Sequence, residues 1–201
     1  MKARFSKIEL KELTISIGVM TLAIAWHKEF ATTLIMLIPA FIILAPAFAL
    51  HELGHKFAAQ KYGYHAEYRM WKKGLLIALA MAVVTTMFGT KFLFIAPGAV
   101  YFGGLHRQHS SISDTGKIGF AGPLVNLGLI AVFGIISIMA TSSFVSYIAS
   151  TGVYVNSFLA VLNLIPFGPL DGKKVLMWNR MFWGVALAIA LAGLVWGSSF
   201  I

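Results

Sequence analysis

The chain has 201 residues, of which 59% are hydrophobic and 11% are charged, and its mean hydropathy is +0.83. This composition excludes a soluble domain of this length and is typical of a polytopic helical membrane protein. The net charge of +9 does not indicate a nucleic-acid partner, because the basic residues form short clusters between apolar spans rather than a long basic run.

Five apolar segments predict membrane-spanning helices, in chain order residues 13–26, 31–60, 118–140, 144–165 and 175–201. The first is short for a bilayer whose apolar core is about 30 Å thick, and the last is interrupted near its start by Asn179 and Arg180. We interpret the first segment as a retained span rather than a removable signal peptide, because no small-residue cleavage site follows it.

Loop charge predicts the orientation of these spans, since Lys and Arg accumulate on the cytoplasmic side. The basic clusters at residues 2–11, 56–73, 107–117 and 173–180 therefore place the N-terminus and the second half of the 31–60 helix toward the cytoplasm of the cell membrane.

Residues 74–104 have both ends on the predicted inner side but are too short for two crossings. We expect this segment to enter the membrane and return, with a β-hairpin or re-entrant loop near residues 92–104, where glycine, proline, β-branched and aromatic residues mix. The alternative is one ordinary helix followed by a loop. The predicted fold class is thus an all-α polytopic membrane protein with about six transmembrane segments, forming a single domain over residues 1–201.

The sequence H-E-L-G-H at residues 51–55 follows twenty uncharged residues and lies in the second half of a predicted span. On a helix, His51 and His55 project from one face and can bind one zinc ion, while Glu52 lies beside them as a base. Cysteine is absent from the sequence, so further ligands must be His, Asp, Glu or Asn. The alternative is a polar helix end that meets lipid headgroups.

A second polar cluster, N-L-I-P-F-G-P-L-D-G at residues 163–172, lies at the inner end of the 144–165 span. Pro166 and Pro169 interrupt the helix and let Asp171 turn toward the bundle at the membrane depth of the two histidines. Asp171 is either the third zinc ligand or a cap of the following helix; the H-E-x-x-H motif favours the ligand.

Together with A-G-P-L-V-N at residues 121–126, these two motifs resemble the site-2 protease family of intramembrane zinc metalloproteases. The resemblance covers residues 31–172. It implies Zn²⁺ bound by His51, His55 and Asp171, Glu52 as the base, and cleavage of transmembrane protein substrates within the lipid bilayer. The sequence has no room for the PDZ or CBS domains of many members, and residues 75–88 are more helical than the short strand expected after the motif.

Two further predictions concern the substrate. Asn163 is our candidate donor to the oxyanion, with Asn126 and Asn156 as rivals that more readily form interhelical hydrogen bonds. We expect the edge formed by Val100, Tyr101, Phe102 and Gly103 to bind an unwound substrate by β-strand addition.

The alternative function is a polytopic metal-binding transporter or channel, which predicts ionisable residues along a path across the membrane. Oligomeric state and physiological substrate do not follow from the sequence.

Overall fold

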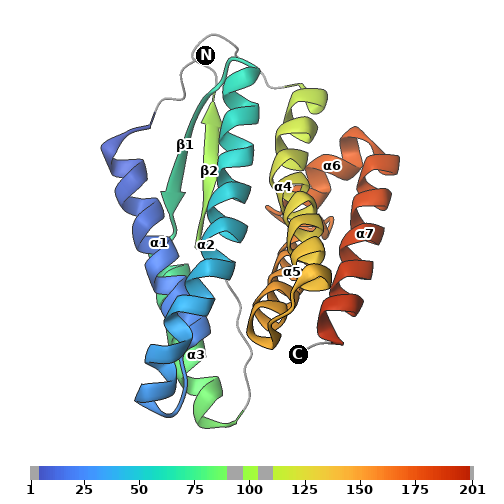
Figure 1. The fold of residues 1–201 in the computed structure, drawn as a ribbon. Coiled ribbons are helices and arrows are strands. Elements are labelled where there is room, and N and C mark those ends of the chain that lie inside the picture. Colours follow the sequence, from blue (N-terminus) through green and yellow to red (C-terminus); the bar gives the residue numbers. More distant parts are fainter. Residues whose placement is uncertain (1–4, 90–96, 104–110, 200–201) are drawn as a thin grey trace.

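The computed structural model describes residues 5–89, 97–103 and 111–199. It consists of seven helices and a small two-stranded sheet within the described residues, and the element order is α1 (Lys7–Ala25), α2 (Phe30–Lys61), β1 (His65–Met70), α3 (Lys72–Met87), β2 (Gly98–Gly103), α4 (Ile112–Met139), α5 (Ser143–Leu164), α6 (Asp171–Trp178) and α7 (Arg180–Ser198). Helix α2 lies between two groups of elements: α1, α3 and the sheet on one side, and α4 to α7 on the other (Figure 1).

The predicted class, an all-α polytopic membrane protein, is confirmed. Among the described residues, four helices are long and apolar enough to cross a membrane, namely α2, α4, α5 and α7. Helix α2 has 32 residues, about 48 Å at 1.5 Å per residue, so it extends beyond an apolar core of about 30 Å. Helices α1 and α3, where we predicted further membrane segments, do not belong to this group.

The interruption predicted near the start of the last span, residues 175–201, separates two helices. Helix α6 ends at Trp178 and α7 begins at Arg180, because Asn179 has an extended backbone (φ −155°, ψ 109°). The Asn179 side chain accepts hydrogen bonds from the backbone N–H groups of Met181 and Phe182 at 2.9 and 3.0 Å. This N-cap satisfies donors that a continuous helix would have bonded internally, and it changes the chain direction after Asp171.

The predicted β-hairpin near residues 92–104 is instead a strand paired with a distant partner. β2 pairs antiparallel with β1, with Tyr68 opposite Val100, and α3 lies between the two strands in the chain. Residues 92–96 and 104 lie outside the described residues. The register pairs Met70 with Gly98 and His65 with Gly103, so α3 begins where β1 ends, at the end of the strand pair where β2 starts (Figure 1).

Helix α1 holds the outer edge of β1 with two carboxylates. Glu9 accepts the backbone N–H of Tyr68 at 3.1 Å, and Glu12 accepts that of Met70 at 3.0 Å. Glu9 also receives two hydrogen bonds from the buried Lys56 ammonium, at 2.7 and 2.6 Å. Lys56 follows His55 directly on α2, so this ion pair fixes the motif helix to α1 and the sheet.

We expect Lys56→Met to lower the free energy of unfolding by about 3–5 kcal/mol, because it leaves the Glu9 carboxylate buried without its cation. The measurement is denaturant unfolding in detergent micelles. Lys61→Met, which removes an exposed lysine from the same helix, is the matched control and should change stability by less than about 0.5 kcal/mol. Equal stability of the two variants would contradict this role of the ion pair.

Candidate metal centre

Helix α2 presents His51 and His55 on one face, one turn apart, and both side chains are buried. Their Nε2 atoms lie 3.0 Å from each other. The helix places both imidazoles against α4, where Gly122 has no side chain to occupy the space. A Cβ built on Gly122 would collide with Nε2 of His55 and lie 2.7 Å from Nε2 of His51.

Asp171 reaches the same point from the first turn of α6, and it too is buried. Its Oδ2 atom lies 2.9 Å from Nε2 of His55 and 3.7 Å from Nε2 of His51. Its other oxygen, Oδ1, accepts a hydrogen bond from the Lys174 ammonium at 2.9 Å, a partner that favours the ionised carboxylate.

The loop before Asp171 depends on two glycines. Gly168 has a φ of +59°, a conformation that favours glycine. Gly172 packs directly on the backbone carbonyl of Leu164, where any Cβ would collide with the oxygen. That carbonyl, freed by the break before Pro166, accepts a hydrogen bond from the indole N–H of Trp183 at 2.8 Å. The chain thereby turns sharply from α5 into α6 and directs Asp171 inward.

Hydrogen bonds on the far side of each ring fix which imidazole nitrogen carries the proton. Nδ1 of His55 lies 2.7 Å from the carbonyl oxygen of Ile118, which can act only as an acceptor. Nδ1 of His51 lies 2.6 Å from Oδ1 of Asn126. The Asn126 NH₂ group donates to the Ala47 carbonyl and to Asn156, so its oxygen is the atom that faces the ring.

In both neutral histidines Nδ1 is therefore the donor and Nε2 carries a lone pair directed at Asp171. Two lone pairs and a carboxylate oxygen that face one another repel unless a cation lies among them. Ligand atoms 2.0–2.1 Å from a tetrahedral zinc lie about 3.3 Å apart, and the three observed separations run from 2.9 to 3.7 Å. The donor set thus fits a divalent cation such as zinc.

Within the part of the chain that the structure describes, these three residues form one group of potential metal ligands. A small cavity of about 70 Å³ adjoins it and is lined by Glu52, by Ala99, Val100 and Phe102 of β2, and by Lys174. This volume holds a few water molecules. Glu52 is buried, its carboxyl contacts the backbone N–H of Val100, and its Oε2 atom has no hydrogen-bond partner among the described residues. A carboxylate oxygen is therefore available to a molecule in the cavity.

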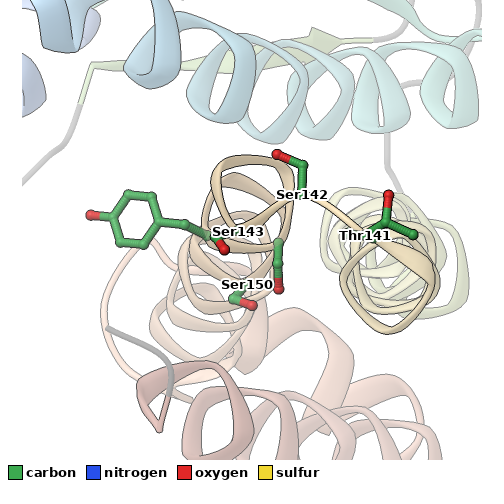
Figure 2. Close-up of a pocket in the computed structure, with 7 residues that line it drawn as sticks. Thr141, Ser142, Ser143 and Ser150 are labelled. Carbon is green, nitrogen blue, oxygen red and sulfur yellow. The ribbon is translucent and has the colours of Figure 1, made fainter.

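A larger hollow of about 360 Å³ lies elsewhere, at the turn between α4 and α5. Figure 2 shows that hydroxyl side chains surround it, among them Thr141, Ser142, Ser143 and Ser150. No carboxylate or imidazole lines it among the residues that the structure describes. The hollow is separate from the metal centre and contains none of the groups that metal chemistry requires.

The other predicted site residues divide into two sets. Val100 and Phe102 line the cavity, whereas the Tyr101 side chain is 67% exposed. Gly103 is exposed at the end of β2, opposite His65. Asn163 does not line the cavity, and its NH₂ group donates to the Leu159 carbonyl at 2.9 Å. Its assignment as the oxyanion donor stays a prediction.

Sequence reasoning missed two residues that shape the centre: Gly122, which makes room for the imidazoles, and Lys174, which contacts Asp171. Asn126, for which we predicted interhelical hydrogen bonds, forms them to α2 and α5 and orients His51. Gly122 and Asn126 both lie in the A-G-P-L-V-N motif. Their spacing of four residues places both on the α4 face that meets α2, and this signal was available in the sequence.

The fold and the centre define a polytopic membrane protein with a buried His-His-Asp group beside a glutamate. The chain is 38% identical over 184 residues to a protein of Methanocaldococcus jannaschii named "Putative zinc metalloprotease MJ0611", and the match covers 90% of each chain. No family model matches, and no solved structure matches.

Two longer relatives match in part. The protein named "Zinc metalloprotease MJ0392" of the same organism is 30% identical over 139 residues, which are 68% of this chain and 32% of the relative. "Putative zinc metalloprotease Rip3" of Mycobacterium tuberculosis is 28% identical over 147 residues, or 69% and 31% of the two chains. The chain belongs to the site-2 protease family of zinc metalloproteases.

We expect Gly122→Ala to abolish metal binding, because the added methyl group would occupy the space that the two Nε2 atoms require. Gly128→Ala on the same helix is the control, since a Cβ there meets no atom within 4 Å. The measurement is zinc content of the purified protein by mass spectrometry. Stoichiometric zinc in Gly122→Ala would show that the ions bind elsewhere.

Proposed function

We propose that the chain is an intramembrane metalloprotease, a single domain over residues 1–201 that hydrolyses peptide bonds within the transmembrane segments of membrane-protein substrates. The observation that carries the proposal is the burial of the H-E-x-x-H pair and Asp171 among helices that are apolar enough to span a bilayer. Ionisable groups in such surroundings are unfavourable by about 2.5–3.5 kcal/mol each, and they are typical of functional sites.

In this proposal His51, His55 and Asp171 bind zinc through Nε2, Nε2 and Oδ2. When bound, zinc supplies Lewis-acid chemistry, because it lowers the pKa of water and polarises a carbonyl oxygen. Glu52 accepts the proton of the attacking water and returns it to the nitrogen of the leaving amine. Its unpartnered Oε2 atom beside the cavity supports this role. Asn163 remains our candidate donor to the oxyanion, which requires its amide to leave the Leu159 carbonyl.

The edges of the sheet support β-strand addition of the substrate. The N–H of Tyr68 bonds to Glu9 rather than to β2, so Tyr68 and Val100 form a non-hydrogen-bonded pair. The backbone groups of Val100 therefore point away from β1, toward Glu52, and those of Phe102 follow the same alternation. Because α1 covers the outer edge of β1, an extended substrate has the edge of β2 available, beside the cavity.

The arrangement of the polar groups favours a protease over the transporter or channel. No Asp, Glu, Lys, Arg or His occurs between Phe120 and Leu170, so the sequence provides no ionisable path along α4 and α5. The ionisable groups of the centre gather instead at one cavity.

We further propose, from the basic clusters next to α2 and α6, that the N-terminus and this centre face the cytoplasm of the cell membrane.

We expect near-stoichiometric zinc in the wild type and in Glu52→Gln, and a loss of most of the zinc in Asp171→Ala, because this variant removes one of three ligands. Glu52→Gln should retain the metal but lose cleavage of a membrane-spanning test substrate, since an amide cannot accept the proton. Asp114→Ala removes a carboxylate that contacts Tyr64 away from the centre and is the control. Equal zinc content in all variants would remove Asp171 from the ligand set.

We expect Phe102→Pro to lower kcat/KM for a membrane-spanning substrate roughly fivefold, because it removes one outward N–H, worth about 1 kcal/mol as a hydrogen bond. Tyr101→Ala, which alters an exposed side chain and keeps the backbone donor, should leave kcat/KM close to the wild-type value. Both variants should retain zinc. An unchanged rate and cleavage site in Phe102→Pro would contradict β-strand addition.

A further inference from the structure

Lys174 contacts the metal centre through the oxygen of Asp171 that does not face the histidines. It lies one turn after Asp171 on α6, and its Nζ donates to Oδ1 of Asp171 at 2.9 Å. Among the described residues that line the cavity, it is the one lysine or arginine. Its side chain is 34% exposed. Burial therefore does not force the ammonium to pair with Asp171.

The lysine stem is directed to Asp171 by the packing of α6 on α4. A Cβ on Gly119 would lie 3.1 Å from both Cβ and Cδ of Lys174, and a Cβ on Gly116 would collide with Trp178. These two glycines, one turn apart on α4, let α6 approach closely and leave the stem in a shallow space between the helices. The neighbouring Lys173 is exposed and does not line the cavity.

The two oxygens of Asp171 thus face different partners. Oδ2 faces the two Nε2 atoms, and Oδ1 faces the Lys174 ammonium. A carboxylate can bind a metal through one oxygen or through both, and the second mode would fill the position that a catalytic zinc keeps open for water or substrate.

We propose that Lys174 is a positioning residue that holds Oδ1 of Asp171 away from the metal, so that the carboxylate binds through one oxygen and the open position is kept for the reaction. This inference rests on the proposed function, because it requires Asp171 to bind a metal. Lys174 acts through Asp171 and need not touch the substrate. Changes to groups that orient metal ligands typically alter activity or metal affinity 10–100-fold.

The test uses the full chain loaded with cobalt(II), whose visible absorption is intense with four ligands and several-fold weaker with five. The variants are Lys174→Met, Lys174→Arg and the matched control Lys173→Met, which removes the same charge from the neighbouring position. We expect the four-ligand spectrum in wild type, Lys173→Met and Lys174→Arg. Lys174→Met should show the weaker spectrum, and its kcat for a membrane-spanning substrate should fall 10–100-fold with KM within about twofold.

A wild-type spectrum and kcat in Lys174→Met would overturn the proposal, because the lysine would then be one surface cation among others. Loss of cobalt from Lys174→Met would also overturn it, since the lysine would be needed for binding rather than for the open position. A wild-type protein that binds no cobalt would refute the proposed function itself. The two failures are therefore distinguishable by the wild-type spectrum alone.

Discussion

Polar groups buried in a helix bundle of this kind require hydrogen-bond or metal partners within the protein, because apolar surroundings supply no water to bind them. The rings of His51 and His55 meet this requirement on one side only, where Nδ1 faces Asn126 and the Ile118 carbonyl. On the other side, both Nε2 atoms face each other and Asp171 without a shared proton donor in the neutral tautomers. A cation is the group that satisfies all three at once, so the hydrogen bonds behind the rings define the binding chemistry in front of them.

Close packing of helices is the second condition for the centre. Helices α2 and α4 meet where a Cβ on Gly54 would lie 2.8 Å from the Ala121 carbonyl, and Gly122 is the next residue along α4. Apolar helices gain little hydrophobic free energy when they exchange contacts with lipid for contacts with each other. Close van der Waals packing at small residues therefore holds them together. The same helix contact thus provides the close backbone approach at Gly54 and the space for the two imidazoles at Gly122. Packing and metal binding therefore depend on different glycines of one interface.

The sequence predicted the parts of the site that depend on local spacing. His51, Glu52 and His55 follow from a helical repeat, and Asp171 follows from the helix break at Pro166 combined with loop charge. The β1–β2 pairing was missed, because Tyr68 and Val100 are joined across α3 and no short-range pattern records a pairing of that kind. The interruption of the last span near Asn179 and Arg180 was predicted, whereas its form, an N-cap that separates two helices, was not.

The two edges of the small sheet differ, and the difference bears on how a substrate would be held. Carboxylates of Glu9 and Glu12 on α1 bind the outward N–H groups of β1, so this edge is satisfied by the chain itself. At β2, Val100 and Phe102 line the cavity, and no second strand among the described residues pairs with this edge. A helical substrate has no free backbone groups to offer, whereas an unwound segment has a full row of them. Under the proposed function, pairing with β2 stabilises the extended form that hydrolysis requires, directly beside Glu52 and the metal ligands.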